Sequence, residues 1–250
     1  MLPSTATPLL ALDAVGMRFP NGVQALDGLE LSIARGEFLS LLGPSGCGKS
    51  TALRLLAGLA RPTAGTVRRP EGLRPGFVFQ EPTLMPWATV FDNVRLPLRL
   101  KGLGADAVRE DVDAALEQVG LGGFARAYPR ELSGGMRMRV SIARALVTRP
   151  DVLLLDEPFA ALDEITRGRL DDELLALWHA HRLTVVFVTH SVYEAIYLST
   201  RVAVFGARPG RVVETIRVDA PHPRGDAFRA DPAYARDCVR ASAALRAAHA

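Results

Sequence analysis

One stretch constrains this chain more than any other: Gly43-Pro44-Ser45-Gly46-Cys47-Gly48-Lys49-Ser50-Thr51, here called the phosphate loop. An apolar run at residues 38–42 precedes it and predicts a buried strand. Residues 52–59 follow it and predict a helix that ends near Gly58. A strand, a glycine-rich loop and a helix in this order favour phosphate binding, because backbone N–H groups and the positive end of the helix dipole face one anion.

The G-x-x-x-x-G-K-[ST] pattern assigns tasks to two side chains. Lys49 would reach the β- and γ-phosphates of a nucleotide, and the Ser50 hydroxyl would hold Mg²⁺. The alternative is an ordinary glycine-rich turn, but a chance match in a chain this long is on the order of one per cent. Lysine occurs only at Lys49 and Lys101, and the other basic residues among the 30 are arginines. The phosphate loop therefore has a compact ammonium group where most basic positions of the chain have a wide guanidinium.

Composition predicts a globular protein. The chain has 250 residues, of which 48% are apolar and 23% charged, enough for one large domain or a domain with an inserted subdomain. The net charge is only +3, and the sequence contains no block of five or more basic residues, which argues against nucleic acid as a partner.

The chain also lacks the usual export and membrane signals. Residues 1–8 have neither the basic start nor the apolar run of a signal peptide. No apolar stretch approaches the length needed to span a bilayer. The two cysteines, Cys47 and Cys238, do not suggest a disulfide framework, so we expect reduced thiols in the cytosol.

Residue patterns divide the chain into three kinds of segment. Apolar and polar residues alternate over residues 9–33 around Asn21-Gly22, which predicts an antiparallel hairpin. Helical periodicity, as at residues 107–116, dominates residues 81–149 and predicts an all-helical insertion. Other helices are expected at residues 164–181 and in the tail from 226. Further strands are expected at residues 66–69, 76–80, 151–156, 184–190, 201–205 and 211–216.

Alternating strands and helices predict an α/β fold with a mostly parallel sheet and flanking helices. To this core we add an N-terminal antiparallel β subdomain and the inserted helical subdomain. The expected boundaries are one domain at 9–240, with a core and β subdomain at 9–80 and 150–220, a helical subdomain at 81–149, and a helical tail at 221–250.

Two adjacent acids follow the apolar run at residues 152–155. Asp156 at the end of a strand can hold the Mg²⁺ of a nucleotide, and Glu157 beside it can polarise an attacking water. The alternative is a solvated strand end. The phosphate loop elsewhere in the chain favours the catalytic interpretation, because phosphoryl transfer needs such carboxylates.

Several motifs in order resemble the nucleotide-binding subunit of ATP-binding cassette (ABC) transporters, over roughly residues 9–218. After the phosphate loop come Gln80, the signature-like Leu132-Ser133-Gly134-Gly135-Met136, the run ending in Asp156-Glu157-Pro158, Ala161-Leu162-Asp163 and His190. The resemblance implies a P-loop NTPase core that binds ATP and Mg²⁺ and hydrolyses ATP.

The resemblance also implies residue roles. Glu157 would activate water, His190 would contact the γ-phosphate and the attacking water, and Gln80 would contact Mg²⁺ or water. The metal ligands would be Ser50, Gln80 and Asp156. The nucleotide contacts would be Phe19 stacked on adenine, the whole phosphate loop, Ser133, Gly134, Gly135, Met136 and Asp163.

Some of these residues have structural alternatives. A histidine at a strand end is more often structural than catalytic, and an aromatic such as Phe19 is as often part of the core. Ser133 followed by two glycines is also a plain helix start with an N-cap. In the family, this start forms a second anion-binding end that faces the nucleotide of a partner protomer, so the resemblance implies an ATP-bridged homodimer.

Three positions depart from the family pattern. Met136 and Met138 stand where glutamines are common, and Ala160 stands where glycine is common. The changes lose amide contacts but keep the fold, and they bear on turnover rate and on communication between sites.

The resemblance extends to a group within the family. Without a membrane span, the membrane domains would be separate chains, as in bacterial importers. Residues 80–90, 191–198 and 208–211 are similar to importers of nitrate, sulfonate, taurine and bicarbonate, and some importers of pyrimidine precursors share these features. The surface around Leu84, Trp87 and Phe91 would hold a permease helix or pack within the helical subdomain.

The expected partners are a second copy of the chain, transmembrane permease subunits bound through the helical subdomain and, indirectly, a solute-binding protein. The expected place is the cytoplasmic face of the inner membrane. The alternatives are a soluble ABC ATPase acting on ribosomes or DNA, and a non-catalytic nucleotide sensor. The sequence leaves open the solute, the oligomeric state without ATP and the role of the tail.

Overall fold

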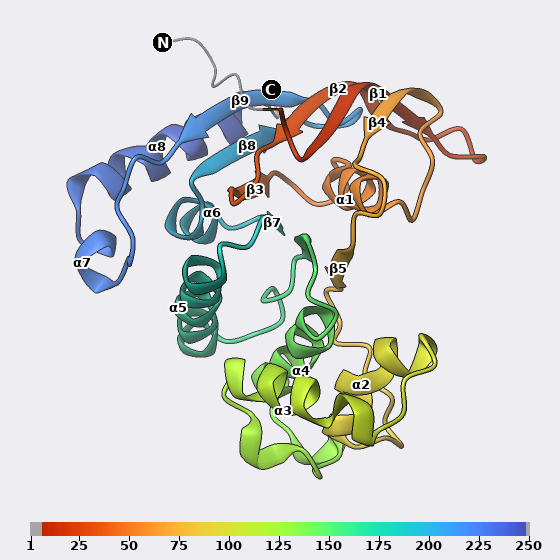
Figure 1. The fold of residues 1–250 in the computed structure, drawn as a ribbon. Coiled ribbons are helices and arrows are strands. Elements are labelled where there is room, and N and C mark those ends of the chain that lie inside the picture. Colours follow the sequence, from red (N-terminus) through yellow and green to blue (C-terminus); the bar gives the residue numbers. More distant parts are fainter. Residues whose placement is uncertain (1–6, 249–250) are drawn as a thin grey trace. The chain divides into compact units, whose positions relative to one another are not determined.

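A computed structural model describes residues 7–248. The chain forms two compact units, one made of residues 7–73 and 178–248 and the other of Arg74–Leu177. Each unit can be followed separately in Figure 1. Residues 1–6, which belong to the stretch tested for a signal peptide, and residues 249–250 of the expected tail lie outside the described residues.

The first unit contains an antiparallel sheet of β1 (Leu10–Arg18), β2 (Gln24–Ile33) and β4 (Ala64–Arg68), in the order β2-β1-β4. The predicted hairpin is confirmed, because β1 pairs antiparallel with β2. Its turn is held by the Asn21 side chain, which accepts a bond from the N–H of Val23 at 3.2 Å. The short strand expected near residue 66 is β4.

The same unit contains three parallel strands, β7 (Val185–Thr189), β3 (Phe38–Leu42) and β8 (Arg201–Phe205), with β3 paired to both others. Every residue of β3 and β7 is buried, as expected for strands covered on both faces. The antiparallel β9 (Val212–Arg217) pairs with β8. The helices α1 (Lys49–Ala57) and α6 (Val192–Leu198) pack against these strands.

The tail continues the first unit as α7 (Asp226–Arg229) and α8 (Pro232–Ala247). The helix α8 packs on α6, β8 and β9. Its buried residues Cys238, Ala241 and Ala244 belong to the same apolar cluster as Ile196 of α6. The tail is therefore part of the folded unit rather than an appended helix.

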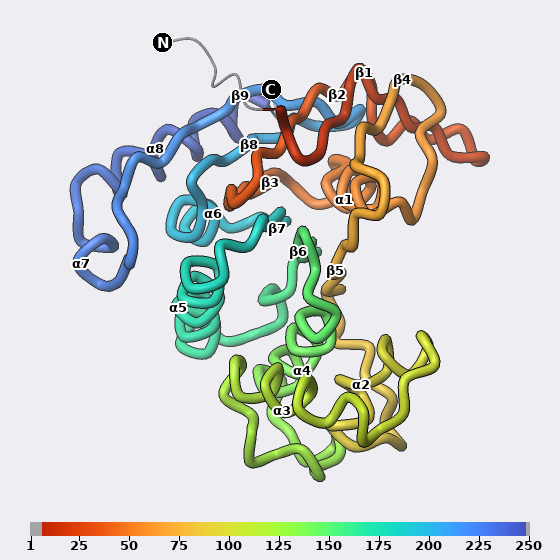
Figure 2. Tube along the Cα trace, in the orientation of Figure 1, coloured from red at the N-terminus to blue at the C-terminus, as the bar shows by residue number. Residues whose placement is uncertain are grey.

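The second unit pairs β5 (Pro75–Val78) in parallel with β6 (Val152–Asp156). Between these strands, residues 81–149, all of which are described, form only helices and loops. Their main helices pack on one another, as the tube in Figure 2 shows: α2 (Val90–Leu100), α3 (Arg109–Gln118) and α4 (Gly134–Leu146). Short 3₁₀ turns lie at Asp106–Val108, Gly122–Phe124 and Pro129–Glu131. After β6, the helix α5 (Glu164–His181) has the bounds that the sequence predicted, and its last residues belong to the first unit.

The α/β fold class is confirmed, while some boundaries differ from expectation. β5 ends at Val78, so Gln80 lies two residues beyond the strand instead of closing it. Pro82 follows soon after and has no N–H to continue a ladder. Within the periodic stretch at residues 107–116, α3 starts only at Arg109, because Asp106–Val108 forms a 3₁₀ turn. In residues 7–248, no helix is both long and apolar enough to cross a membrane.

Candidate functional site

The phosphate loop connects β3 to α1 and is built around glycines. Gly48 is the N-cap of α1 with φ of 102°, a conformation that glycine adopts without strain. A Cβ added there would lie 2.7 Å from the carbonyl oxygen of Ala25. Gly43 is equally confined, because its Cβ would lie 2.9 Å from both Sγ of Cys47 and Cβ of Phe205. The loop therefore excludes side chains at both positions.

Lys49 and Ser50 follow at the start of α1. The Lys49 side chain is buried, and its ammonium donates to the carbonyls of Gly43 at 2.7 Å and Pro44 at 2.8 Å. The backbone N–H groups of the first turn of a helix have no partner within the helix, so an anion can accept from them. A glycine cradle that a Cβ would fill, a lysine ammonium and a hydroxyl fit the phosphates of a nucleotide.

Cys47 lies within this loop and is buried, with 2% of its surface exposed. Its carbonyl oxygen is also packed, since a Cβ added at Gly210 would lie 2.2 Å from it. The residue acts as a small packed side chain within the loop.

Phe19 lies one residue beyond β1, at the beginning of the hairpin turn. Its N–H donates to the carbonyl of Val23 at 2.9 Å, and its side chain is 37% exposed. The ring is therefore not part of the buried core, and a partly exposed ring is available for stacking. Its contact with adenine stays a prediction.

His190 follows β7 directly and is exposed. A hydrogen-bonded turn surrounds it: the N–H of Ser191 donates to Oγ1 of Thr189 at 2.9 Å, and the N–H of Glu194 donates to Oγ of Ser191 at 3.3 Å. The Thr189 hydroxyl also donates to the buried Glu194 carboxylate. These bonds start α6 and fix the backbone on both sides of His190.

In the second unit, the signature-like sequence forms the start of α4. Ser133 is the N-cap and accepts a bond from the N–H of Met136 at 3.2 Å. A Cβ added at Gly135 would lie 2.9 Å from Cγ2 of Thr166, and one added at Gly134 would lie 3.3 Å from Cδ2 of Leu162. The two glycines thus allow the start of α4 to approach the first turn of α5 and the residues just before it.

A cavity of about 210 Å³ opens at this helix start. Its lining consists of Ser133, Gly135, Met136, Arg139, Thr166 and Arg169. Arg139 also pairs with Glu173 at 2.5 Å. A helix N-terminus with two guanidiniums nearby is suited to an anionic group.

The two methionines that depart from the family pattern lie in different environments. Met138 is 2% exposed and is part of the core, so its side chain replaces an amide by apolar packing. Met136 is half-buried and lines the cavity, where an amide could donate a hydrogen bond but a thioether cannot.

Asp156 and Glu157 occupy the end of β6. Asp156 is the last residue of the strand and is 7% exposed. Glu157 has a φ of +46°, in the left-handed region that is uncommon for residues other than glycine. Such backbone strain concentrates at functional sites, because it persists only where the surroundings enforce it.

Asp163 precedes α5 and accepts a bond from the N–H of Thr166 at 2.9 Å. This backbone bond, followed by one from the Thr166 hydroxyl, lowers the pKa of Asp163 below its usual value. The carboxylate therefore has a structural task at the helix start, and the sequence motif alone did not indicate it. A contact with nucleotide stays a prediction.

Gln80 is exposed after β5 and begins a segment whose backbone is held from two sides. The buried Asn93 accepts from the N–H of Met85 at 2.7 Å and donates to the carbonyls of Met85, Ala88 and Thr89. Arg144 of α4 donates to the carbonyl of Pro82 at 2.7 Å, and burial lowers the pKa of this guanidinium. Sequence reasoning missed both side chains, since a lone Asn or Arg within a helix carries no motif.

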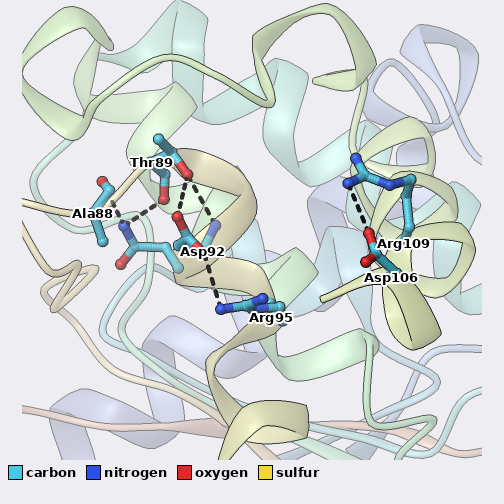
Figure 3. Close-up of polar contacts among 7 residues, drawn as sticks. Ala88, Thr89, Asp92, Arg95, Asp106 and Arg109 are labelled. Carbon is cyan, nitrogen blue, oxygen red and sulfur yellow. Dashed lines mark hydrogen bonds and ion pairs between the residues drawn. The ribbon is translucent and has the colours of Figure 1, made fainter. Parts of the chain in front are cut away.

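Figure 3 shows how the start of α2 is fixed. Thr89 caps the helix by accepting from the N–H of Asp92 at 3.1 Å, and Asp92 pairs with Arg95 at 3.3 Å. Arg109 pairs with Asp106 nearby at 3.4 Å. Against this fixed backbone, Trp87 is 77% exposed, whereas Leu84 and Phe91 are half-buried. Trp87 is thus a surface residue rather than part of the packing within the helical region.

Comparison with known proteins agrees with these features. Residues 26–160 match the ABC transporter family. The chain is 47% identical to a putative ATP-binding protein of Brucella abortus, over 91% of this chain and 90% of that protein. It is 49% identical to an aliphatic sulfonates import ATP-binding protein of Pseudomonas syringae, over 91% of this chain and 92% of that protein.

Solved structures show the same relationship. A bacterial ABC transporter cassette solved as a dimer superposes with a TM-score of 0.73 at 32% identity, over 85% of this chain and all of that one. The family resemblance and the P-loop NTPase fold expected from the sequence are therefore confirmed. The chain belongs to the ATP-binding proteins of the ABC transporter family and is an ABC-type ATPase.

Proposed function

We propose that this chain is the ATP-hydrolysing subunit of an importer for a small organic anion of the sulfonate type. The observation that carries the proposal is the 49% identity, over 91% of the chain, to a protein named for aliphatic sulfonate import. Two Bacillus proteins with the same kind of name are 47% identical over 80% of this chain. These names favour import over a soluble ABC ATPase acting on ribosomes or nucleic acid.

The roles of single residues in ATP hydrolysis are assigned from their positions in the motifs. Lys49 and the loop N–H groups bind the β- and γ-phosphates, Glu157 accepts the proton of the attacking water, and His190 holds the γ-phosphate and that water. The strained backbone of Glu157 and the hydrogen-bonded turn around His190 support these assignments. Phe19 stacks on the adenine.

The proposed metal is Mg²⁺, held by the Ser50 hydroxyl, the Asp156 carboxylate and Gln80. All three are oxygen donors, which Mg²⁺ prefers. When bound, the ion neutralises charge on the β- and γ-phosphates. The protein's own part is to fix the donors, and the burial of Asp156 at the end of β6 limits how that carboxylate can turn.

The active form is proposed to be a homodimer. The N-terminus of α4, with Ser133 and the cavity beside it, offers a second anion site that a partner's nucleotide can fill. In the proposed dimer, Asp163 and Met136 also lie next to the partner's nucleotide. A related cassette has been solved as a dimer, which supports this arrangement.

The permease is proposed to bind the segment that follows Gln80. Trp87 exposes a large apolar ring from a backbone that Asn93 and Arg144 hold in place, and such rings are frequent anchors at interfaces. The chain would lie at the cytoplasmic face of the membrane. Its link to a solute-binding protein would be indirect, through the permease.

Growth on defined sulfur sources tests the transport proposal. A strain lacking this gene should grow normally on sulfate but poorly on aliphatic sulfonates as the sole sulfur source. The wild-type gene should restore growth, and a gene carrying Glu157→Gln should not. Normal growth of the deletion strain on sulfonates would contradict the cargo assignment, and RNA-stimulated ATPase activity of the purified chain would favour the alternative function.

A further inference from the structure

The loop that joins β8 to β9, residues 206–211, packs against the phosphate loop within the first unit. Gly210 donates its N–H to the carbonyl of Ala25 at 2.8 Å. A Cβ added at Gly210 would lie 2.2 Å from the carbonyl oxygen of Cys47. The two loops thus meet main chain to main chain, and this contact fixes the position of the neighbouring Arg208.

Arg208 contacts the phosphate loop directly. Its Nε donates to the carbonyl oxygen of Gly46 at 2.7 Å. A Cβ added at Gly46 would lie 2.8 Å from Nη2 of Arg208, so the guanidinium occupies the space that a side chain at position 46 would need. Gly46 has a φ of +76°, where glycine is unstrained.

The direction of this hydrogen bond has a consequence for phosphate binding. A carbonyl oxygen carries partial negative charge, so a loop that binds an anion through N–H groups has to keep its carbonyls away from that anion. A bond from a charged guanidinium is stronger than a neutral one. Arg208 therefore stabilises the backbone orientation in which the Gly46 carbonyl faces a cation.

Lys49 and Arg208 differ in whether their bonds to the loop change when nucleotide binds. Lys49 also donates to loop carbonyls, those of Gly43 and Pro44. It exchanges these bonds for phosphate in the proposed function. Arg208 has no assigned contact with nucleotide, so its bond to Gly46 can persist in the bound state.

We propose that Arg208 is a positioning residue of the nucleotide site, which holds the Gly46 carbonyl and keeps the phosphate loop in its binding conformation before nucleotide arrives. The proposal rests on the proposed function, in which this loop binds ATP. Preorganisation lowers the ordering cost of binding, so Arg208 acts on affinity rather than on the hydrolysis step.

The test compares two arginines of the same loop in the full-length chain. Arg208→Met keeps the aliphatic stem and removes the donor. Arg211→Met is the matched control, because the Arg211 side chain is exposed and pairs with Asp27 at the surface, at 3.0 Å. Calorimetry gives the Kd for ATP and for ADP, a phosphate-release assay gives KM and kcat, and thermal unfolding checks the fold.

In Arg208→Met we expect the Kd for both nucleotides to rise about tenfold, since a bond to a charged donor is lost. The KM for ATP should rise in parallel, while kcat at saturating ATP stays within about twofold, as expected for lost uniform binding. Arg211→Met should bind both nucleotides like wild type, with a Kd within about twofold. Arg208→Lys should recover part of the affinity, because an ammonium can donate to the same carbonyl.

Three results would overturn the proposal. They are an unchanged Kd in both Arg208 variants, a loss of ATP affinity with normal ADP affinity, which would mean a direct γ-phosphate contact, and an equal loss in Arg211→Met. Lys49→Ala, measured alongside, separates this proposal from the proposed function. If Lys49→Ala also binds ATP normally, the phosphate-loop assignment itself fails.

Discussion

At the residue scale, single side chains have two kinds of task in the candidate site. Lys49, Glu157 and His190 have the chemistry that nucleotide hydrolysis needs. Asp163 and Asn93 instead fix the backbone by accepting from the N–H groups of Thr166 and Met85. Substitutions of the first kind should change binding or catalysis and leave the fold intact.

The two lysines of the chain provide a matched pair. Lys49→Ala should lower the affinity for ATP by about 100-fold, because a charged donor in a largely dry cradle is lost. Lys101→Ala removes the same charge from the exposed end of α2 and should bind ATP like wild type. Calorimetric titration with ATP measures both. Equal affinities in the two variants would remove the phosphate-loop assignment.

Glu157→Gln tests the proposal that Glu157 is the general base that activates the attacking water. It should keep ATP binding, reduce turnover by about 100-fold or more, and accumulate a nucleotide-bound dimer detectable by size-exclusion chromatography with light scattering. Glu164→Gln changes an exposed acid at the start of α5 and should hydrolyse ATP normally. Wild-type phosphate release by Glu157→Gln would show that another group activates water.

At the scale of elements, α6 connects the candidate site to the tail. Its first turn carries the bonds around His190, and its last carbonyls are bound by Arg224, which is 8% exposed. Arg224 donates to the carbonyls of Tyr197 at 2.7 Å and Ser199 at 2.9 Å. A cation at a helix C-terminus is favourable, so the tail stabilises the helix that follows His190.

Arg224→Met should therefore destabilise the protein by about 3 kcal/mol, because several buried carbonyls lose their donor. Arg240→Met removes an arginine of α8 whose pair with Glu214, at 2.5 Å, is partly exposed, and it should cost under about 1 kcal/mol. Urea unfolding measures both free energies. A difference below about 0.5 kcal/mol between the variants would mean that water replaces Arg224 at the helix end.

At the scale of the whole molecule, one half-buried histidine gives folding a pH dependence. Burial foremost, and then the charges of Arg224 and His179, lowers the pKa of His222 from 6.5 to about 4. Its ring lies 4.6 Å from that of Trp178, and within the described residues neither of its nitrogens has a hydrogen-bond partner. The folded protein therefore keeps this imidazole neutral.

Because the folded pKa of His222 is below the unfolded value, the unfolded chain binds more protons between about pH 6.5 and 4. This contribution to stability is complete above pH 6.5 and is lost as the pH falls through that window. We expect it to reach about 1 kcal/mol, reduced because the ring is only half-buried. Urea unfolding at several pH values should show a flatter profile for His222→Gln than for wild type.

His181→Gln is the control for this measurement, because His181 is exposed at the end of α5. Its pH profile should follow that of wild type. If His222→Gln and wild type lost stability in parallel below pH 6.5, the dependence would belong to other groups.

The parts of this protein that short runs of consecutive residues encode could be predicted without its fold. The strand, glycine loop and helix around Lys49 follow from local periodicity and from glycine's conformational freedom, and the hairpin at Asn21 follows from turn chemistry. The order of short motifs also predicted the family, which the comparisons confirmed. Each motif consists of a few consecutive residues, so it can be recognised without knowledge of the fold.

Which distant groups support those motifs can be seen only in the folded chain. Arg208 lies 162 positions from Gly46 in the sequence, and it meets that carbonyl only because β8 pairs with β3 and the loop after β8 packs on the phosphate loop. Arg224 likewise contacts the end of α6 only because the chain after β9 packs against that helix in the folded protein. A bond from a side chain to a backbone carbonyl constrains no neighbouring residue type, so it leaves no pattern in the sequence.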